Sequence, residues 1–177
     1  MILVAVGEFP PPLLERLSRR TRLPLGPARV DPAVAFDTAR AQYDSTRLLA
    51  ELKARYEGEV VGAASLDLYI PVLTYVFGEA EMPGRAALFS IHRLREEFYG
   101  LPPDQALLEE RALRELWHEV GHLWGLAHCP DAACVMSASY SLAQVDSKSD
   151  QFCPACRARL GPARPQGTRP AAGSQPA

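Results

Sequence analysis

The sequence lacks the features that mark a nucleic-acid-binding protein or a membrane protein. Its 177 residues include 19 basic and 21 acidic side chains, a formal net charge of −2, so no excess of positive charge favours a phosphate backbone. No apolar run is long enough to cross a bilayer, and the run MILVAV ends at Gly7 without a basic segment before it. We therefore expect a monomeric cytoplasmic protein that contacts neither membrane nor nucleic acid.

Histidine and cysteine are also scarce, but they lie close together. Three of the 4 His fall between residues 118 and 128, and all 4 Cys fall between residues 129 and 156. Structural disulfides are rare in the cytoplasm, so these cysteines need another role. Metal-binding residue types crowded into about forty positions predict a metal centre.

The remaining sequence predicts one compact domain over residues 1–161. A tail rich in proline and glycine, residues 162–177, has little to bury and is expected to be disordered. We expect strands over 2–6, 59–65, 72–79 and 85–91, and helices beginning near Pro12, from Asp44 to about Tyr56, over 104–124 and around 156–160.

The segment His118-Glu119-Val-Gly-His122-Leu-Trp-Gly125-Leu-Ala-His128 carries the chemistry. On a helix, His118 and His122 are separated by about 40° and share a face, roughly opposite the apolar residues of the same stretch. Gly125 can adopt the left-handed conformation that ends a helix, which allows the chain to bring His128 back to the pair. On a continued helix His128 would lie about 15 Å from His118 along the axis, too far to share an ion. The three imidazoles therefore predict a catalytic zinc site with a fourth position open to water.

Glu119 follows the first histidine directly, where its carboxylate can reach the metal-bound water without being a ligand. Zinc makes such a water acidic enough to act as a nucleophile near neutral pH. We predict that Glu119 is the general base and then the proton donor to the leaving amine. The sequence thus predicts a zinc metallopeptidase that hydrolyses peptide bonds.

This string matches HExxHxxGxxH, the motif of the metzincin clan of zinc peptidases. The residues that follow resemble one family of that clan, the archaemetzincins: Cys129 comes directly after the third histidine, then Cys134-Val-Met136, then Cys153-Pro-Ala-Cys156. Sixteen residues separate Met136 from Cys153, where the family pattern has seventeen, which indicates a loop shorter by one residue. By this resemblance Met136 is the Met-turn of the clan, an apolar floor under the histidine ligands.

Two further segments, 67–71 and 75–78, also resemble the archaemetzincins. The resemblance implies an α+β, metzincin-like fold with a twisted mixed sheet, backing helices, the active-site helix and a small zinc-stabilised lower subdomain. We accordingly expect an upper subdomain over about 1–125 and a lower one over about 126–161. An extended peptide substrate would lie in the cleft between them, against an edge strand near 74–82.

The four cysteines have the spacings C-x4-C and C-x2-C, which suit a tetrahedral zinc site made of thiolates. Neighbouring residues of an extended chain point to opposite sides, so His128 can face the first metal while Cys129 faces a second. We predict a closed structural zinc at Cys129, Cys134, Cys153 and Cys156, hence two zinc ions in all, which stabilises a subdomain too small for a large core. Free buried thiols or two disulfides are the alternatives.

Other polar residues near these motifs receive structural interpretations. Tyr140 is expected to pack or to lie at the surface rather than to approach a substrate oxyanion. His92 is expected to be an ordinary sheet residue, and Asp67 a turn or capping carboxylate. The edge-strand carboxylates Glu79 and Glu81 favour a basic group or an N-terminal amine on the substrate, or else protect the edge from aggregation.

Two other function classes stay open. A metal-dependent endoribonuclease also spaces three histidines in this way, and four arginines after Cys156, with no acidic residue among them, suit phosphate contacts: Arg157, Arg159, Arg164 and Arg169. Such an enzyme needs neither Glu119 nor the cysteine quartet. The other class is a catalytically inactive zinc-stabilised binding protein, which explains the cysteines and leaves Glu119 unexplained.

Overall fold

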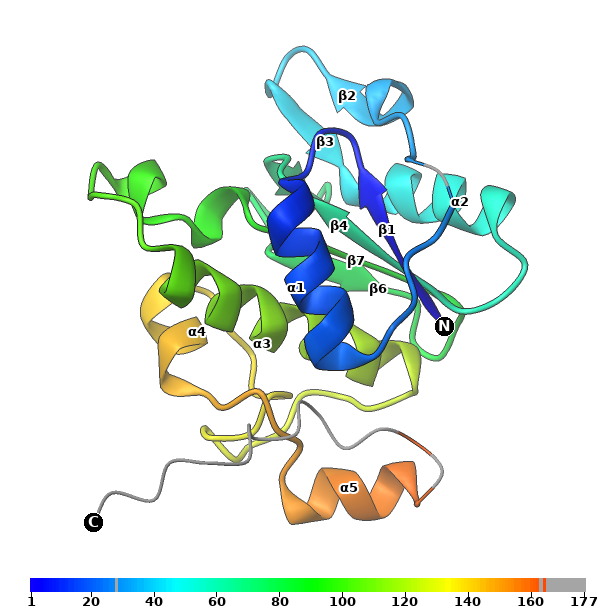
Figure 1. Cartoon of the computed structure of the whole chain (residues 1–177), viewed down its shortest axis with the longest axis vertical. Helices are drawn as coiled ribbons and strands as arrows, with labels where there is room; N and C mark the ends of the chain where they lie inside the picture. Colours follow the sequence, from blue (N-terminus) through cyan, green and yellow to red (C-terminus); the bar gives the residue numbers. More distant parts are fainter. Residues whose placement is uncertain (28, 163, 165–177) are drawn as a thin grey trace.

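The structure is a computed structural model of the chain, and it describes residues 1–27, 29–162 and 164 (Figure 1). The disordered tail predicted for residues 162–177 lies, apart from Pro162 and Arg164, outside these residues. Within the described ranges, no helix is long and apolar enough to cross a membrane.

The strands of the described residues lie between Ile2 and Ser90, with two α-helices among them and three after them. The strands are β1 (Ile2–Val6), β2 (Phe36–Asp37), β3 (Gln42–Asp44), β4 (Val60–Ala64), β5 (Leu68–Tyr69), β6 (Gly78–Ala80) and β7 (Ala86–Ser90). The helices are α1 (Pro11–Thr21), α2 (Ser45–Arg55), α3 (Gln105–Leu123), α4 (Leu142–Ser147) and α5 (Pro154–Leu160), with 3-10 turns at Ala33–Ala35, His92–Leu94 and Glu96–Tyr99.

The central sheet is mixed and has the strand order β1-β4-β7-β6. The first three strands are parallel, whereas β6 pairs antiparallel with β7 and forms one edge. One face packs against α1 and α3 through residues such as Leu3 and Phe89, and the other packs against α2 through residues such as Val4 and Leu88 (Figure 1). The α+β fold class is confirmed. The sheet places the edge strand β6 beside α3.

The predicted helices begin where their capping residues require. The carboxylate of Asp44 accepts a hydrogen bond from the Arg47 backbone N–H at 3.2 Å, and that of Asp104 accepts one from the Leu107 N–H at 2.9 Å. Each carboxylate satisfies a donor that the first helical turn leaves unpaired. The starts of α2 and α3 are therefore fixed by local sequence.

One predicted strand is wrong, and so is the placement of His92. The strand expected over 72–79 is reduced to β6, because Val72 and Leu73 follow Pro71 into a turn and are 83% and 45% exposed. The strand expected over 85–91 is confirmed as β7, and it ends at Ser90, whose hydroxyl accepts the backbone N–H of His92 at 3.1 Å. His92 therefore begins a 3-10 turn and is not a sheet residue. The small sheet β2-β3-β5 was not predicted, since strands of two or three residues leave no periodic pattern.

A buried ion pair joins the segment after α4 to α3. Lys148 Nζ lies 2.9 Å from Glu115 Oε1, and the two side chains are 0% and 3% exposed. Removing one partner of a buried pair leaves an uncompensated charge, which typically costs about 3–5 kcal/mol. We expect Lys148→Met to lower the free energy of unfolding by about this amount, measured by urea denaturation.

The chain offers a matched control for this substitution. Its only other lysine, Lys53, pairs with Glu81 near the surface and is 38% exposed, so Lys53→Met is expected to cost about 0–1 kcal/mol. The double variant Lys148→Met with Glu115→Leu should recover much of the loss. Equal costs for the two lysine variants would contradict the interpretation of the buried pair.

Candidate metal centres

The C-terminal end of α3 brings three imidazoles together. His118 and His122 lie one turn apart on the helix, and Gly125 follows it with a φ of +89°. The Gly125 N–H donates to the His122 carbonyl at 2.8 Å, and the Leu126 N–H donates to the Gly121 carbonyl at 2.9 Å, which closes the helix. The chain then turns back, so that one ring nitrogen each of His118, His122 and His128 lies within 4.8 Å of the others.

Backbone carbonyls orient two of these rings. His118 Nδ1 lies 2.8 Å from the Val135 carbonyl oxygen, and His122 Nδ1 lies 2.7 Å from that of Leu126. A carbonyl oxygen only accepts, so both Nδ1 atoms carry the proton, and each Nε2 presents a lone pair. These Nε2 atoms are 3.1 Å apart, and two lone pairs at that distance repel unless a cation lies between them.

This donor set fits zinc. Zinc–nitrogen bonds of 2.0–2.1 Å in a tetrahedral site separate the nitrogen ligands by about 3.3 Å, close to the spacing of the two Nε2 atoms. Burial lowers the pKa of His118 well below its ordinary value, and it also lowers the pKa values of His122 and His128. All three imidazoles are therefore held in the neutral form that binds metals.

Glu119 lies beside this cluster with its side chain buried. The residue is 4% exposed, and its carboxylate lies against the backbone of the edge strand, where a Cβ on Gly78 would be 2.5 Å from Oε1. Burial raises the pKa of Glu119 well above its ordinary value; the charge of Glu115 acts in the same direction and that of Lys148 against it. A carboxylate with a raised pKa is a stronger proton acceptor than a solvated one.

The histidine cluster opens into a cleft of about 470 Å³. Residues 73–80 and Met82 form its upper wall, and residues 138–140 form its lower wall, with Glu119 and the three histidines between them. A larger cavity of about 850 Å³ lies over the ends of β1 and β4, but none of the clustered histidines and cysteines lines it. The smaller cleft is therefore the place where the titratable groups converge.

Met136 packs directly against α3. Its side chain is fully buried, and a Cβ on Gly121 would overlap its sulfur atom, so the glycine allows this close approach. The Met136 carbonyl accepts the backbone N–H of Cys129 at 2.9 Å. The methionine thus lies between the histidine-bearing turn of α3 and the loop that leads from His128 to the cysteines.

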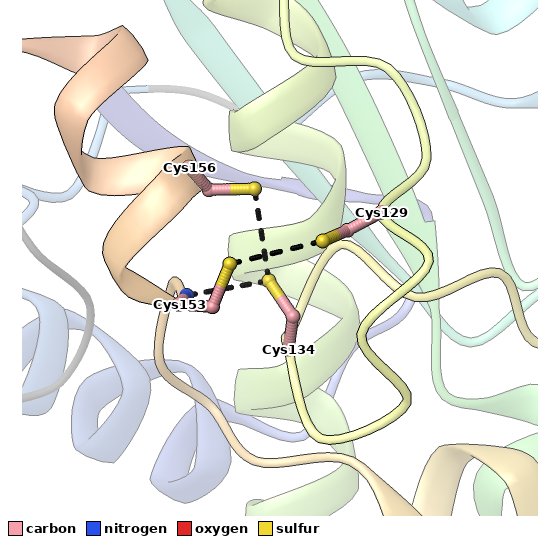
Figure 2. A group of neighbouring side chains, drawn as sticks. All are labelled: Cys129, Cys134, Cys153 and Cys156. Atoms are coloured by element: carbon pink, nitrogen blue, oxygen red, sulfur yellow. Dashed lines mark hydrogen bonds between the residues drawn. The ribbon is translucent and has the colours of Figure 1, made fainter.

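The four cysteines form a second cluster next to the first. Figure 2 shows Cys129 and Cys134 on the loop after α3 and Cys153 and Cys156 at the start of α5, with their sulfur atoms facing one another. The Sγ–Sγ distance is 3.7 Å between Cys129 and Cys153 and 3.8 Å between Cys134 and Cys156. Four sulfurs around a zinc at 2.3 Å are about 3.8 Å apart, whereas a disulfide needs about 2.05 Å. The structure therefore holds four free thiols, and the two measured distances are close to those in a tetrahedral zinc site.

Backbone donors point at these sulfurs. Cys134 Sγ accepts the N–H of Met136 at 3.4 Å and the N–H of Cys153 at 3.3 Å. The backbone N–H of Cys156 lowers the pKa of Cys153 to about 7. Cys153 is thus partly a thiolate near neutral pH, and the thiolate is the form that binds zinc.

Two of the remaining interpretations change. Asp67 is not a turn or capping residue: its two carboxylate oxygens accept from Arg93 at 2.6 and 2.8 Å. Glu79 accepts hydrogen bonds from two hydroxyls at the start of α2, and Glu81 pairs with Lys53. These two carboxylates hold β6 to α2, so the proposed attraction for a basic substrate group loses its support.

Comparisons with known proteins agree with this picture. The chain matches the model of Peptidase family M54 over residues 16–161, a range that includes α3 and both clusters. An archaemetzincin of Methanocaldococcus jannaschii is 46% identical over 129 residues, covering 73% of this chain and 72% of the relative. One from Pyrococcus furiosus is 38% identical over 175 residues, covering 90% and 91%.

Solved structures are similar as well. The crystal structure of the archaemetzincin of Methanopyrus kandleri superposes with a TM-score of 0.77 and 39% identity, over 90% of this chain and 93% of that one. A zinc-dependent peptidase of Methanocorpusculum labreanum superposes with a TM-score of 0.78 and 30% identity, over 91% of this chain and 100% of that one.

Proposed function

The chain belongs to peptidase family M54 and is a zinc metallopeptidase, and from this premise we propose that it hydrolyses peptide bonds in the histidine-lined cleft with Glu119 as its general base. The observation that carries the proposal is the place of the Glu119 carboxylate. It is buried, it lines the same cleft as the three histidines, and it touches the edge strand at Gly78.

Each group of residues in the cleft has a separate proposed role. His118, His122 and His128 are the proposed ligands of a catalytic zinc, which when bound polarises a carbonyl and acidifies a water. The carbonyls of Val135 and Leu126 hold the first two rings in the tautomer that presents Nε2. Glu119 accepts the proton of the attacking water at its carboxylate and then delivers it to the nitrogen of the leaving amine.

The edge strand supports a peptide substrate. One side of β6 pairs with β7, and the cleft lies along its other side, so the strand's outward N–H and C=O groups can pair with an extended chain. Main-chain pairing of this kind accepts many sequences. The proposed substrate class is therefore peptide or protein segments in an extended conformation.

We further propose that Cys129, Cys134, Cys153 and Cys156 hold a second, structural zinc, which gives two zinc ions per chain. Because Cys129 directly follows His128, this ion would fix the third histidine of the catalytic site. It would also stabilise a lower subdomain, residues 126–161, beneath the upper subdomain of a single catalytic domain. The cytoplasmic location stays a prediction that four free cysteines support.

The arrangement favours peptide hydrolysis over RNA hydrolysis. Arg157 Nε donates to the Phe152 carbonyl at 2.6 Å, and Arg164 pairs with Glu59 at 2.9 Å, so neither extends freely toward a phosphate. Arg169 lies outside the described residues. An inactive binding protein would have no use for a buried carboxylate beside three neutral imidazoles.

The proposal is tested with the purified, zinc-loaded protein on a mixed peptide library and on single-stranded RNA. We expect cleavage of peptides that a zinc chelator abolishes and added zinc restores, with little dependence on salt. Cleavage of RNA that falls steeply with salt, without peptide cleavage, would support the ribonuclease alternative. No cleavage of either substrate would support the inactive binding protein.

Gly78 gives a second test of how Glu119 is positioned. A methyl group at residue 78 would collide with the Glu119 carboxylate and move it from its place beside the histidines. A displacement of about 1 Å can cost on the order of 10²-fold in rate, so we expect Gly78→Ala to lower kcat/KM by about that factor. The measurement is steady-state hydrolysis of a fluorogenic peptide, with the melting temperature as a check on folding.

The matched control is Gly58→Ala. Nothing lies within 4 Å of a Cβ at Gly58, so this variant should keep the activity of the wild type. If Gly78→Ala were as active as Gly58→Ala, the close contact between the strand and the carboxylate would have no role in catalysis.

A further inference from the structure

A hydrogen bond joins the two walls of the cleft near one end of the upper wall. The hydroxyl of Tyr75, in the upper wall just before β6, donates to the backbone carbonyl of Tyr140 in the lower wall, at 2.8 Å. Both residues line the same cleft as the histidine cluster. The Tyr75–Tyr140 bridge therefore joins the two walls between which an extended substrate would lie.

Two side chains hold the upper end of the bridge. The Arg93 guanidinium lies over the Tyr75 ring, 4.3 Å from its centroid, and is itself fixed by two hydrogen bonds to Asp67. The Phe77 ring meets the Tyr75 ring edge-on at 5.5 Å. The phenol is thus aimed at the lower wall by contacts that do not depend on a substrate.

The lower end of the bridge is fixed as well. The Tyr140 N–H donates to Gln144 Oε1, in the first turn of α4, at 2.7 Å. This bond anchors the backbone of Tyr140, the residue whose carbonyl accepts the hydrogen bond from the Tyr75 hydroxyl. Both ends of the bridge are therefore anchored. Breaking it requires the two walls to move apart, because the Tyr75 side chain is not free to rotate away.

The position of the bridge limits the length of substrate that fits between it and the catalytic residues. Tyr75 precedes Gly78 by three residues, and three residues of chain span at most about 10 Å. Since Gly78 is the point where Glu119 meets the edge strand, the backbone of Tyr75 lies at most about three substrate residues from the scissile bond. Toward the other end of the cleft, Met82 lines the upper wall and is 55% exposed.

We propose that Tyr75 is a specificity-determining residue: its bridge to Tyr140 closes one end of the cleft and directs cleavage to within about three residues of one end of a peptide. The inference rests on the proposed peptidase function and deepens it. A chain that continues past the bridge has to displace this hydrogen bond, whereas a chain that ends before the bridge leaves it intact. The net contribution of one hydrogen bond corresponds to about three- to tenfold in an equilibrium, which sets the size of the expected preference.

The test uses a short peptide that the wild-type protein cleaves, together with two longer versions. One carries about six Gly and Ser residues, roughly 20 Å of chain, at its N-terminus, and the other carries the same extension at its C-terminus. For the wild type we expect kcat/KM to fall about three- to tenfold with one extension and to stay constant with the other. For Tyr75→Phe, which removes only the hydroxyl, we expect all three peptides to be cleaved with similar kcat/KM.

A matched control removes the same group elsewhere. The Tyr99 hydroxyl donates to the Arg93 carbonyl at 3.0 Å, and Tyr99 does not line the cleft, so Tyr99→Phe should keep the wild-type length preference. Equal cleavage of all three peptides by the wild type would overturn the inference, as would a preference that survives in Tyr75→Phe. Failure of the wild type to cleave any peptide would instead overturn the proposed function itself.

Discussion

Replacing Glu119 by glutamine is expected to lower kcat by about 10²–10⁴-fold while the protein keeps its fold and its zinc. The amide has nearly the same shape as the carboxylate, so the packing against Gly78 is preserved. It has no proton-accepting oxygen of comparable basicity, so neither the activation of the water nor the transfer to the leaving amine is assisted. The measurement is peptide hydrolysis at saturating substrate, with zinc content determined on the same samples.

Another glutamate of the same helix provides the control. Glu110, at the opposite end of α3, pairs with Arg20 at the surface, and its side chain is 42% exposed. Glu110→Gln should leave kcat unchanged. Wild-type turnover in Glu119→Gln would eliminate this carboxylate as the base, whereas a loss of zinc in that variant would make it a ligand.

Replacing Cys153 by serine is expected to remove one of two zinc ions and to disorder the chain between α3 and the tail. Structural zinc contributes about 10–16 kcal/mol in small zinc domains, which is more than the stability of most domains. The region around the cysteines has few alternatives for holding its loops, because its two helices, α4 and α5, span 6 and 7 residues. We expect limited proteolysis to cut residues 126–160 of this variant much faster than those of the wild type.

Turnover should fall together with the second zinc. Cys129 is adjacent to His128, and its N–H is bound to the Met136 carbonyl, so disorder at the cysteines reaches the third histidine. Cys153→His provides the rescue, since three thiolates and one imidazole also form a tetrahedral zinc site. If Cys153→Ser kept two zinc ions and resisted proteolysis like the wild type, the cysteine cluster would not be a structural centre.

The parts of the fold that depend on local sequence could be predicted, and those that depend on distant contacts could not. The helix α3 follows from its apolar period, its Asp104 cap and the glycine at Gly125. The turn at Val72 could not be predicted, because an apolar residue in a strand-like run can still lie at the surface. The 3-10 turn at His92 could not be predicted either, because it depends on the Ser90 hydroxyl, which accepts the His92 N–H and ends the strand.

The same distinction between local sequence and distant contacts applies to the candidate site. Histidines and cysteines could be assigned because metal sites impose short, characteristic spacings along the chain. Gly78 fell within a segment similar to the archaemetzincins, but its contact with Glu119 depends on the packing of a strand against a helix. The Tyr75–Tyr140 bridge joins residues 65 positions apart, and no pattern in the sequence relates them.

Our central proposal is that two zinc ions, one catalytic and one structural, bind side by side. Anomalous scattering at the zinc absorption edge, measured on crystals of the wild-type protein, tests this proposal most directly. We expect two peaks per chain, one among His118, His122 and His128 and one among the four cysteine sulfurs. A single peak, or two peaks of which neither lies between the histidines, would contradict the claim.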